Sequence, residues 1–554
     1  MSEQELKLHV PAAAGATIAK ELLKRGATRI RLHALYFDTP DRELARARIA
    51  LRLRLEGRQW MQTLKTPGAD AITRQELNHP RPGPVLDLSV YAGTELEAAL
   101  SKLRGPLGLR YETDVQRLLC KVRSRQGTVE LAYDTGLLRA GTLELPISEL
   151  EFELMSGRPA AIFAVSHGWQ KRHQLLLDTR SKSHRGDALA TLAPQLGAAE
   201  SDKARANLIA GFWAPRGASG VVLDPAMDAP AAMAAIAAEC IEQIACNAAA
   251  LAEVDTLGVY QAGNSEHVHQ LRVGMRRLRS AWRLFNGWIA PPPAALLEGM
   301  RAHFAAFGAN RDQDVLEETV APMLQKAGMP VIPAQPRPGE QADAHAIAAG
   351  PAFQTWLVDL LEWSLNVQPP AQPAEMPGAA VGDEPGADAP EGTAQAGAAT
   401  DAAEAEPPSG PIEPIIIPLH QARPPAPLPK RLANRLHRWH ERVAGQGLHF
   451  GALTLEDRHE LRKRGKRLRY GLAFAESLLP AARLQPYRKQ LSLVQDLLGE
   501  INDLAVARDH YRAQCEVHPQ AWFALGWIEA RLDALVAQAQ QAFTDLANTK
   551  PFWK

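Results

Sequence analysis

Residues 148–154, Ser-Glu-Leu-Glu-Phe-Glu-Leu, carry a glutamate at every second position with large apolar residues between them. Side chains alternate between the two faces of a β-strand, so Glu149, Glu151 and Glu153 share one face of a predicted strand. Two unit charges about 4 Å apart repel each other by roughly 4 kcal/mol at an effective dielectric near 20. These carboxylates therefore need water, a cation, or lysine and arginine side chains beside them.

The same alternation of charged and apolar residues recurs along roughly the first 200 residues. At the N-terminus, Glu3, Glu5 and Lys7 share a face, and Arg52 and Arg54 alternate with leucines that can pack against outer helices. Further charged residues of this kind are Lys65, Arg74, Glu76, Arg117 and Asp134. Solvent on one face explains a single such strand. Because the pattern repeats with both signs of charge, it predicts a closed barrel with its charged faces inside.

A barrel with such an interior suits a polyanion that is complexed with a divalent metal ion. Carboxylates are hard oxygen ligands for the metal, and lysine and arginine bind phosphate oxygens. Water could then attack a terminal phosphorus in line, helped by positioning and electrostatics. The sequence contains no P-loop, no glycine-rich dinucleotide turn and no nucleophilic serine elbow, which argues against conventional ATPases and dehydrogenases.

These motifs together resemble the CYTH domain, the triphosphate tunnel metalloenzyme family. They are ExExK at 3–7, YFDTPD at 36–41, ALRLR at 50–54, TLKTP at 63–67, ELEFEL at 149–154 and SKSHRGDAL at 181–189. The resemblance covers about the first 200 residues. It implies an eight-stranded antiparallel tunnel that hydrolyses or cyclises triphosphates with Mg²⁺ or Mn²⁺.

The resemblance also implies roles for single residues. The metal-binding carboxylates would be Glu3, Glu5, Glu149, Glu151 and, on the same face, Glu153. The phosphate-binding positions would be Lys7, Arg52, Arg54, Lys65, Arg117, Lys182 and Arg185. Glu5, Lys7 and the additional acidic position Asp134 are the expected catalytic residues.

From about residue 225 the sequence turns helical. The segment MAAIAAECIEQIACNAAALAEV is rich in strong helix formers and predicts one long helix. In the next segment, HVHQLRVGMRRLRSAWRLF, basic residues recur at spacings of three and four opposite an apolar face. The segment RHELRKRGKRLRYGLAF repeats this layout, so that His269, Arg272 and Arg276 align with His459, Arg462 and Lys466. GANRDQDV, with Gly308, and GEINDLAV, with Gly499, extend the repeat and predict a pseudo-twofold helical bundle.

This region resembles a CHAD domain, a helical module often fused to CYTH. The resemblance rests on the two basic stripes, which begin at His269 and His459, and on the motifs RDQDV at 311–315 and NDLAVA at 502–507. The resemblance implies a basic surface that binds inorganic polyphosphate, which many charge contacts can hold. The expected residues are His269, Arg272, Arg276, Arg279, His459, Arg462, Lys466 and Arg469. Aromatic residues are not interleaved along the stripes, which disfavours nucleic acid as the partner.

The predicted architecture is therefore α+β: an antiparallel eight-stranded barrel at 1–200, an interdomain linker at 201–224 and an all-α domain at 225–545. A stretch at 367–426 is rich in Pro, Ala and Gly, with acidic residues, and predicts a disordered linker inside the helical domain. The sequence leaves its role open.

The amino-acid composition limits the partners and the cellular location that we expect for the protein. The 554 residues include 62 basic and 62 acidic side chains, so no global charge favours a nucleic-acid or membrane partner. Four scattered cysteines indicate neither a disulfide framework nor a zinc site. The start lacks a signal peptide and no long apolar run follows, so we expect a soluble cytoplasmic protein without a membrane partner. The oligomeric state stays open.

The leading functional hypothesis is a metal-dependent inorganic triphosphatase with a polyphosphate-binding helical domain. The alternatives are a class IV type adenylate cyclase, a thiamine or nucleoside triphosphatase, and a non-catalytic polyphosphate scaffold. The sequence shows no pocket for a base or a thiazolium. The intact acidic strands argue against the scaffold.

Overall fold

The computed structural model describes residues 2–68, 70–256, 265–308, 316–330, 332, 343–370 and 426–549. The described residues up to Pro370 and from Pro427 onward form one compact unit. The expected disordered linker at 367–426 falls almost entirely outside the described residues.

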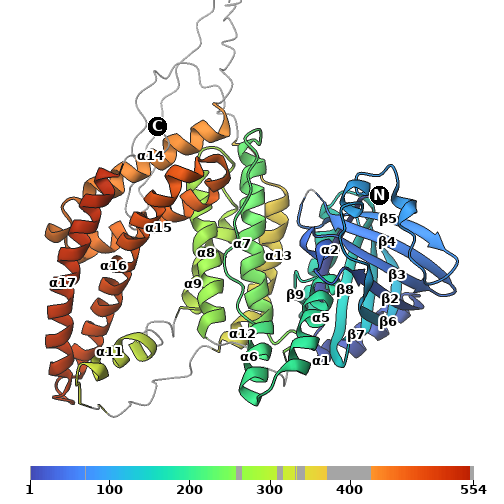
Figure 1. Cartoon of the computed structure of the whole chain (residues 1–554), viewed down its shortest axis with the longest axis horizontal. Coiled ribbons are helices and arrows are strands. Elements are labelled where there is room, and N and C mark those ends of the chain that lie inside the picture. The colour runs from blue at the N-terminus through green and yellow to red at the C-terminus, as the bar shows by residue number, and fades with distance from the viewer. Residues whose placement is uncertain are drawn as a thin grey trace, which may run out of the picture. The chain divides into compact units, whose positions relative to one another are not determined.

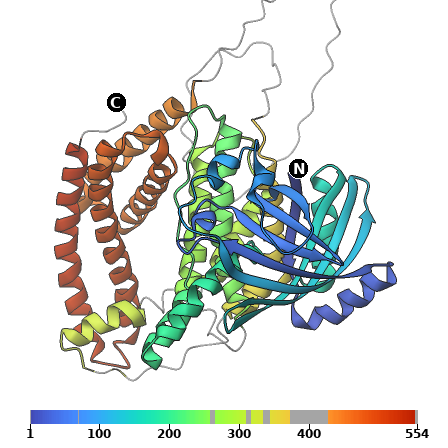
Figure 2. The ribbon, with the colours of Figure 1, turned by 45° about the vertical axis from the view of Figure 1, so that its right-hand side comes forward.

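The N-terminal region is a closed antiparallel barrel (Figure 1). Its strands are β1 (Ser2–His9), β2 (Thr28–Asp38), β3 (Ala50–Glu56), β4 (Gln59–Pro67), β5 (Thr73–Arg81), β6 (Gly108–Arg123), β7 (Gly127–Ala140) and β8 (Leu143–Gly157). The order β5-β4-β3-β2-β6-β7-β8-β1 closes because β1 also pairs with β5. The predicted eight-stranded barrel is confirmed, and the short β9 (Leu176–Leu177) adds to the outer edge of β1. Figure 2 shows the strands curving around the barrel interior.

The apolar faces of the strands point outward and bury side chains under helices. Leu8 of β1 and Phe152 of β8 are fully buried in a core that includes Ile18 of α1 (Ala12–Lys24) and Phe163 of α4 (Ala160–His173). Leu51 of β3 packs in a second cluster with Leu44 of α2 (Glu43–Arg46) and Leu100 of α3 (Glu97–Leu100). Since neighbouring residues on a strand face opposite ways, the charged residues between these positions point into the barrel.

One part of the barrel interior is apolar, which the sequence pattern did not predict. Leu32, Val115 and Ile147 form a cluster with Leu189 of α5 (Lys182–Ala198) and with Trp213. Val115 shares its strand face with Arg117, and Ile147 shares its face with Glu149, so these apolar residues face inward. The helix α5 and Trp213 therefore fill this part of the interior, and the charged residues occupy the rest.

The segment expected as a linker contains a helix, α6 (Asp202–Phe212), which leads into the buried Trp213. Beyond it lie α7 (Ala229–Leu251), α8 (Ser265–Leu284), α9 (Ala294–Ala306), the short π-helix η2 (Leu316–Val320), α11 (Ala321–Lys326), α12 (Ala344–Ala349) and α13 (Pro351–Leu365). After the undescribed stretch come α14 (Leu428–Gly447), α15 (Leu455–Phe474), α16 (Ala481–Gln514) and α17 (Ala521–Asn548). Figure 1 shows α16 and α17 side by side, and these two helices pack along each other.

The helices predicted from the two repeated segments are confirmed, and they contact each other. The apolar face of α8 is buried, with Leu271, Met275 and Leu278 fully inaccessible to solvent. In α15, Leu461 and Leu468 are equally buried. The packing of α8 against α15 brings their basic residues to the same part of the domain.

Among the described helices, only α7 is long and apolar enough to cross a membrane by length and composition. It packs against α8 and α13, and more than half of its most apolar window is buried inside the protein. All four cysteines are free thiols.

Candidate functional site

Three carboxylates surround the ammonium group of Lys182 inside the barrel. Lys182 begins α5, whose N-terminus is capped by the Ser181 hydroxyl accepting from the backbone N–H of His184. The Nζ atom lies 2.7 Å from Asp134 Oδ2 and 2.8 Å from Glu151 Oε1, and it also contacts Glu149. The three carboxylates have oxygens within 4.8 Å of one another. The helix start thus places a cation at the point where these oxygens converge.

Arg117 of β6 completes this cluster. Its Nε and Nη2 atoms donate to the two oxygens of Asp134, each at 2.7 Å, and Nη2 also donates to Glu151 at 2.6 Å. The strand register explains the contact, because Arg117 lies opposite Asp134 and Asp134 lies opposite Glu149. The Asp134 side chain is only 1% exposed, so both its oxygens are occupied by cationic donors and little water reaches it.

Burial and charge act against each other on these groups. Burial alone would lower the pKa of Lys182, but Asp134, Glu149 and Glu151 raise it well above its ordinary value. Burial alone would raise the pKa of Glu151, but Lys182 and Arg117 hold it well below its ordinary value. Lys182 and Glu151 therefore stay ionised at neutral pH, because each is held by charges of the opposite sign.

A second group of carboxylates surrounds Lys65 of β4. Its Nζ atom lies 2.8 Å from Glu76, 3.1 Å from Glu5 and 3.6 Å from Glu3. Glu76 also lies 3.9 Å from Arg52. Burial opposes ionisation of Glu76, but Arg52 and Lys65 lower its pKa to about 2.

Two predicted residues have more peripheral contacts. Arg54 donates from Nε to Glu56, which is 37% exposed, at 2.6 Å. Glu153 lies opposite Glu5 on β1 and opposite Glu130 on β7. Burial, reinforced by Glu3, Glu130 and Glu5, raises the pKa of Glu153 to about 7.

The remaining predicted barrel residues, Lys7 and Arg185, lie at the other side of Glu149. Lys7 Nζ is 3.6 Å from Glu149 Oε2 and donates to the backbone carbonyl of Arg180. Arg185 donates from Nη2 to Glu149 at 3.0 Å and from Nη1 to Asp255 at 2.8 Å. Asp255 follows α7, so the helical region contributes a side chain to the end of the charged interior.

The structure thus places the predicted carboxylates in two groups: Glu149 and Glu151 around Lys182, and Glu3 and Glu5 around Lys65. Sequence reasoning placed Glu76 on a charged strand face but gave it no role in the site. It missed the neighbours His9, Glu130, Asp178, Arg180 and Asp255. His9 continues the alternation of β1 by one step, and Glu76 shares a strand face with Arg74, so both had a signal. Asp255 had none, because no periodicity links it to the barrel.

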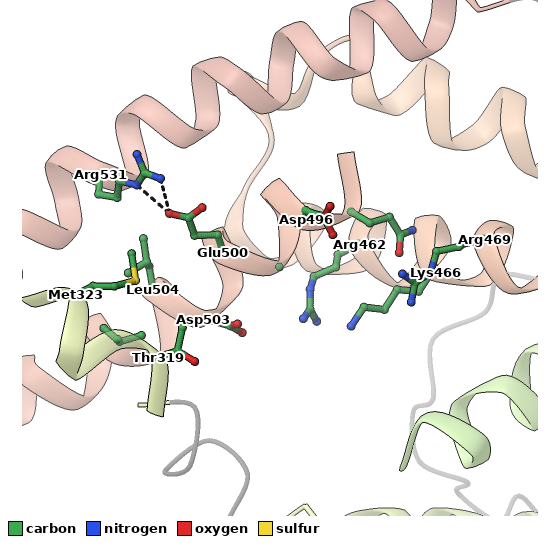
Figure 3. Close-up of a pocket in the computed structure, with 13 residues that line it drawn as sticks. Thr319, Met323, Arg462, Lys466, Arg469, Asp496, Glu500, Asp503, Leu504 and Arg531 are labelled. Carbon is green, nitrogen blue, oxygen red and sulfur yellow. Dashed lines mark hydrogen bonds and ion pairs between the residues drawn. The ribbon is translucent and has the colours of Figure 1, made fainter. Parts of the chain in front are cut away.

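A cavity of about 570 Å³ lies in the helical domain (Figure 3). Arg462, Lys466 and Arg469 line it from α15, and Asp496, Glu500 and Asp503 line it from α16. Gly499, which the sequence repeat singled out, also lines it. Arg531 of α17 bonds to Glu500 at 2.8 Å. The pocket therefore has a cationic wall and an opposing wall with carboxylates.

Arg276 of α8 belongs to the same cationic group. Burial, reinforced by Arg462, Arg276 and Arg469, lowers the pKa of Lys466 to about 7. Burial likewise lowers the pKa of Arg462, with Arg276 adding to the effect. The two predicted stripes thus meet at Arg276, Arg462 and Lys466.

The other predicted residues of the stripes lie elsewhere on their helices. Arg272 donates to the carbonyl of Phe304 at 2.6 Å and stacks 4.2 Å over its ring. Arg279 lies 5.8 Å from the same ring. His269 is half-buried on α8, and His459 is exposed on α15 and does not line the cavity. The RDQDV motif at 311–315 lies outside the described residues.

A curated inorganic triphosphatase from Haemophilus influenzae is 30% identical over 203 residues, which cover 34% of this chain and 56% of that relative. The chain thus spans about half the length of the curated relative it matches. The crystal structure of the CHAD domain from the plant Ricinus communis is 22% identical, with a TM-score of 0.42, and the match covers 61% of this chain and 98% of that one. A Hippeastrum structure, for which a dominant triphosphatase activity is described, is 19% identical with a TM-score of 0.25, covering 33% and 93%.

Two family models match this chain in succession. The CYTH domain model matches residues 1–186, which include the whole barrel and the start of α5. The CHAD domain model matches residues 235–512, which is half of the chain and includes α8, α15 and the cavity-lining part of α16. The chain therefore belongs to the CHAD domain family and carries a CYTH domain at its N-terminus.

Proposed function

We propose that the CYTH barrel hydrolyses inorganic triphosphate to pyrophosphate and phosphate with Mg²⁺ or Mn²⁺. The observation that carries the proposal is the cluster of Asp134, Glu149 and Glu151 around the Lys182 ammonium. Three carboxylates that converge within 4.8 Å, those of Asp134 and Glu149 buried and that of Glu151 partly buried, form a set of hard oxygen donors, which suits either metal. The ammonium group that they hold supports a cation site at this position.

The carboxylates of this cluster would bind the metal ion, and its cations would bind the phosphate groups. Glu149 and Glu151 would hold the metal, which when bound neutralises phosphate charge and polarises the phosphorus–oxygen bond that breaks. Lys182 and Arg117 would then exchange their carboxylate contacts for phosphate oxygens, with Lys7, Arg52 and Lys65 as further cations in the same interior. The oxygen of a water molecule forms a new bond to the terminal phosphorus while the bond from that phosphorus to the bridging oxygen breaks. Pyrophosphate leaves, the attacking water loses a proton to solvent, and fixed cations stabilise the charge on the phosphoryl group.

The test is turnover of three substrates by the full chain. Tripolyphosphate, ATP and thiamine triphosphate are each incubated with Mg²⁺ or Mn²⁺, and phosphate and cyclic AMP are measured. We expect phosphate from tripolyphosphate at the highest rate. Cyclic AMP as the product from ATP would refute the hydrolase, and no turnover of any substrate would favour a scaffold.

A matched pair of variants on β8 tests the assignment. Glu151→Gln removes a carboxylate of the cluster, and we expect turnover to be lost. Glu144→Gln makes the same change on the same strand, where the side chain is 52% exposed, and should leave turnover unchanged. Equal activity of both variants would contradict the proposed role of Glu151.

We further propose that the CHAD domain binds inorganic polyphosphate through the cationic group of Arg276, Arg462 and Lys466. The support is their convergence from two helices, at a position where burial, reinforced by Arg462 and Arg276, lowers the pKa of Lys466 to about 7. A polyanion would relieve this repulsion, since its oxygens can bind several cations at once.

Polyphosphate affinity is measured at rising salt to test this binding. Each charge contact that is lost should reduce the slope of log affinity against log salt by about one. We expect Arg276→Gln with Lys466→Gln to reduce the slope by about two. The control is Arg483→Gln with Lys489→Gln, at exposed positions of α16. An affinity that does not respond to salt would refute a charge-based site.

A further inference from the structure

A side chain of the CHAD domain reaches the charged interior of the CYTH barrel. Asp255 lies four residues after the end of α7, within the range matched by the CHAD model. Its Oδ2 atom lies 2.8 Å from Nη1 of Arg185 and 3.8 Å from Nη2 of Arg180, both within the CYTH match. The side chains of Asp255 and Arg185 are 1% and 4% exposed. Water therefore screens this ion pair very little.

The backbone that carries Asp255 adopts an uncommon conformation. Glu253 and Asp255 have φ angles of +60° and +63°, the left-handed region that non-glycine residues seldom occupy. This conformation is unfavourable for a residue that carries a side chain, so the surrounding contacts must hold the turn in place. Val254, between them, is buried, and Thr256 is fully buried. The turn is thus fixed on both sides of Asp255.

Asp255 and Glu149 accept hydrogen bonds from different nitrogens of the Arg185 guanidinium. Nη1 donates to Asp255, and Nη2 donates to Glu149 at 3.0 Å. The Nε atom is buried and finds no hydrogen-bond partner among the described residues. Leaving a buried donor without a partner is costly, so Nε is available for a phosphate oxygen. If Glu149 turns to a metal ion, Nη2 becomes available as well, while Asp255 still holds Nη1.

We infer that Asp255 of the CHAD domain is a positioning residue for the CYTH domain, which orients Arg185 toward the anionic substrate. The inference rests on the proposed triphosphatase function. It means that the CYTH site is completed by the helical domain, and that the affinity of the barrel for triphosphate depends on the turn after α7.

Asp255→Asn in the full chain tests this role. We expect the KM for tripolyphosphate to rise about tenfold, because one charge-assisted hydrogen bond is lost. The kcat should stay within about twofold of the wild-type value. Asp255→Glu, which keeps the charge, should recover part of the loss. The control is Glu253→Gln, the same kind of change at an exposed residue of the same turn, which should behave as the wild type. An unchanged KM in Asp255→Asn, or a lower one, would overturn the inference.

A double variant keeps the test informative if Asp255→Asn fails to fold because Arg185 loses its partner. Arg185→Met and Arg185→Met/Asp255→Asn remove the cation. Arg180 remains beside Asp255 and Lys182 remains beside Glu149, so we expect both variants to fold and to share one KM. A further increase of KM in the double variant would show that Asp255 acts independently of Arg185 and would overturn the inference.

A failure of the inference about Asp255 can be distinguished from a failure of the proposed triphosphatase function. If the wild type hydrolyses no triphosphate, the proposed function fails, and tripolyphosphate binding measured by calorimetry then decides the inference. Weaker binding by Asp255→Asn than by Glu253→Gln would support it. Equal binding, or no binding to the wild type, would overturn it.

Discussion

Asp134→Asn tests whether the buried carboxylate of Asp134 anchors the cations of the barrel. Asp134 accepts three bonds of 2.7 Å, two from Arg117 and one from Lys182. An asparagine keeps one oxygen and turns an NH₂ group toward the cations on the other side. If the kept oxygen faces Arg117 Nε, the two contacts at Oδ2 are lost.

The cost follows from these contacts. A hydrogen bond to a charged group contributes about 1.5–3 kcal/mol, so two lost contacts amount to about 3–6 kcal/mol. Lys182 and Arg117 both keep Glu151, at 2.8 and 2.6 Å, which favours the lower end of that range. We therefore expect Asp134→Asn to lower the free energy of unfolding by about 3 kcal/mol.

Urea denaturation measures this loss against a matched control. Asp114 accepts two bonds from Arg31 in the same barrel, but these side chains are 27% and 69% exposed. An exposed ion pair contributes at most about 1 kcal/mol, so Asp114→Asn should cost little. Equal destabilisation by the two variants would refute the reasoning from burial.

Enzyme kinetics distinguish two possible roles of Asp134: holding Arg117 and Lys182 in place, or binding the metal ion. If Asp134 anchors Arg117 and Lys182, Asp134→Asn raises the KM for tripolyphosphate more than it raises the Mn²⁺ concentration for half-maximal activity. A tenfold increase of the Mn²⁺ requirement with an unchanged KM would show that Asp134 binds the metal instead.

Three further predictions concern packing and pH. A Cβ atom on Gly186 would lie 2.3 Å from the Tyr111 ring, so Gly186→Ala should displace α5 and lower turnover, with Gly197→Ala on the open side of α5 as control. Since the pKa of Glu76 falls from 4.5 to about 2 on folding, its stabilisation is present above pH 4.5 and lost as the pH falls through 2. The difference in unfolding free energy between the wild type and Glu76→Gln, on the order of 3 kcal/mol at pH 7, should therefore vanish over that window; a constant difference would contradict it. Lys466, with a pKa of about 7, should take up about one proton when polyphosphate binds at pH 8. Calorimetry in two buffers should show this uptake for the wild type and none for Lys466→Arg.

The sequence predicted those parts of the barrel that depend on local order. A strand alternates with a period of two, so the glutamates of β8 and the arginines of β3 had to share faces wherever the strands lay. The closed sheet then followed from repetition, because many half-charged strands need a common interior. The same reasoning from a period of 3.6 gave α8 and α15 with their buried leucines.

The sequence did not predict which charges would meet across the barrel. It grouped Glu3, Glu5, Glu149 and Glu151 but did not indicate which lysine each would contact. Lys65 lies beside Glu3 and Glu5, and Lys182 lies beside Glu149 and Glu151. The sequence pattern predicted charge throughout the interior, whereas α5 and Trp213 fill one part with apolar side chains. Nor did the basic stripes indicate that α16 supplies carboxylates to the same pocket.

What the sequence alone determined was therefore the list of charged residues and the face on which each would lie, since these follow from backbone geometry over a few residues. Only the tertiary structure decided the pairings. Lys182 reaches its carboxylates because α5 enters the barrel, and Asp255 reaches Arg185 across 70 residues of chain because the turn after α7 is held at the barrel. Contacts of this kind depend on how whole elements pack, and no local pattern in the chain encodes them.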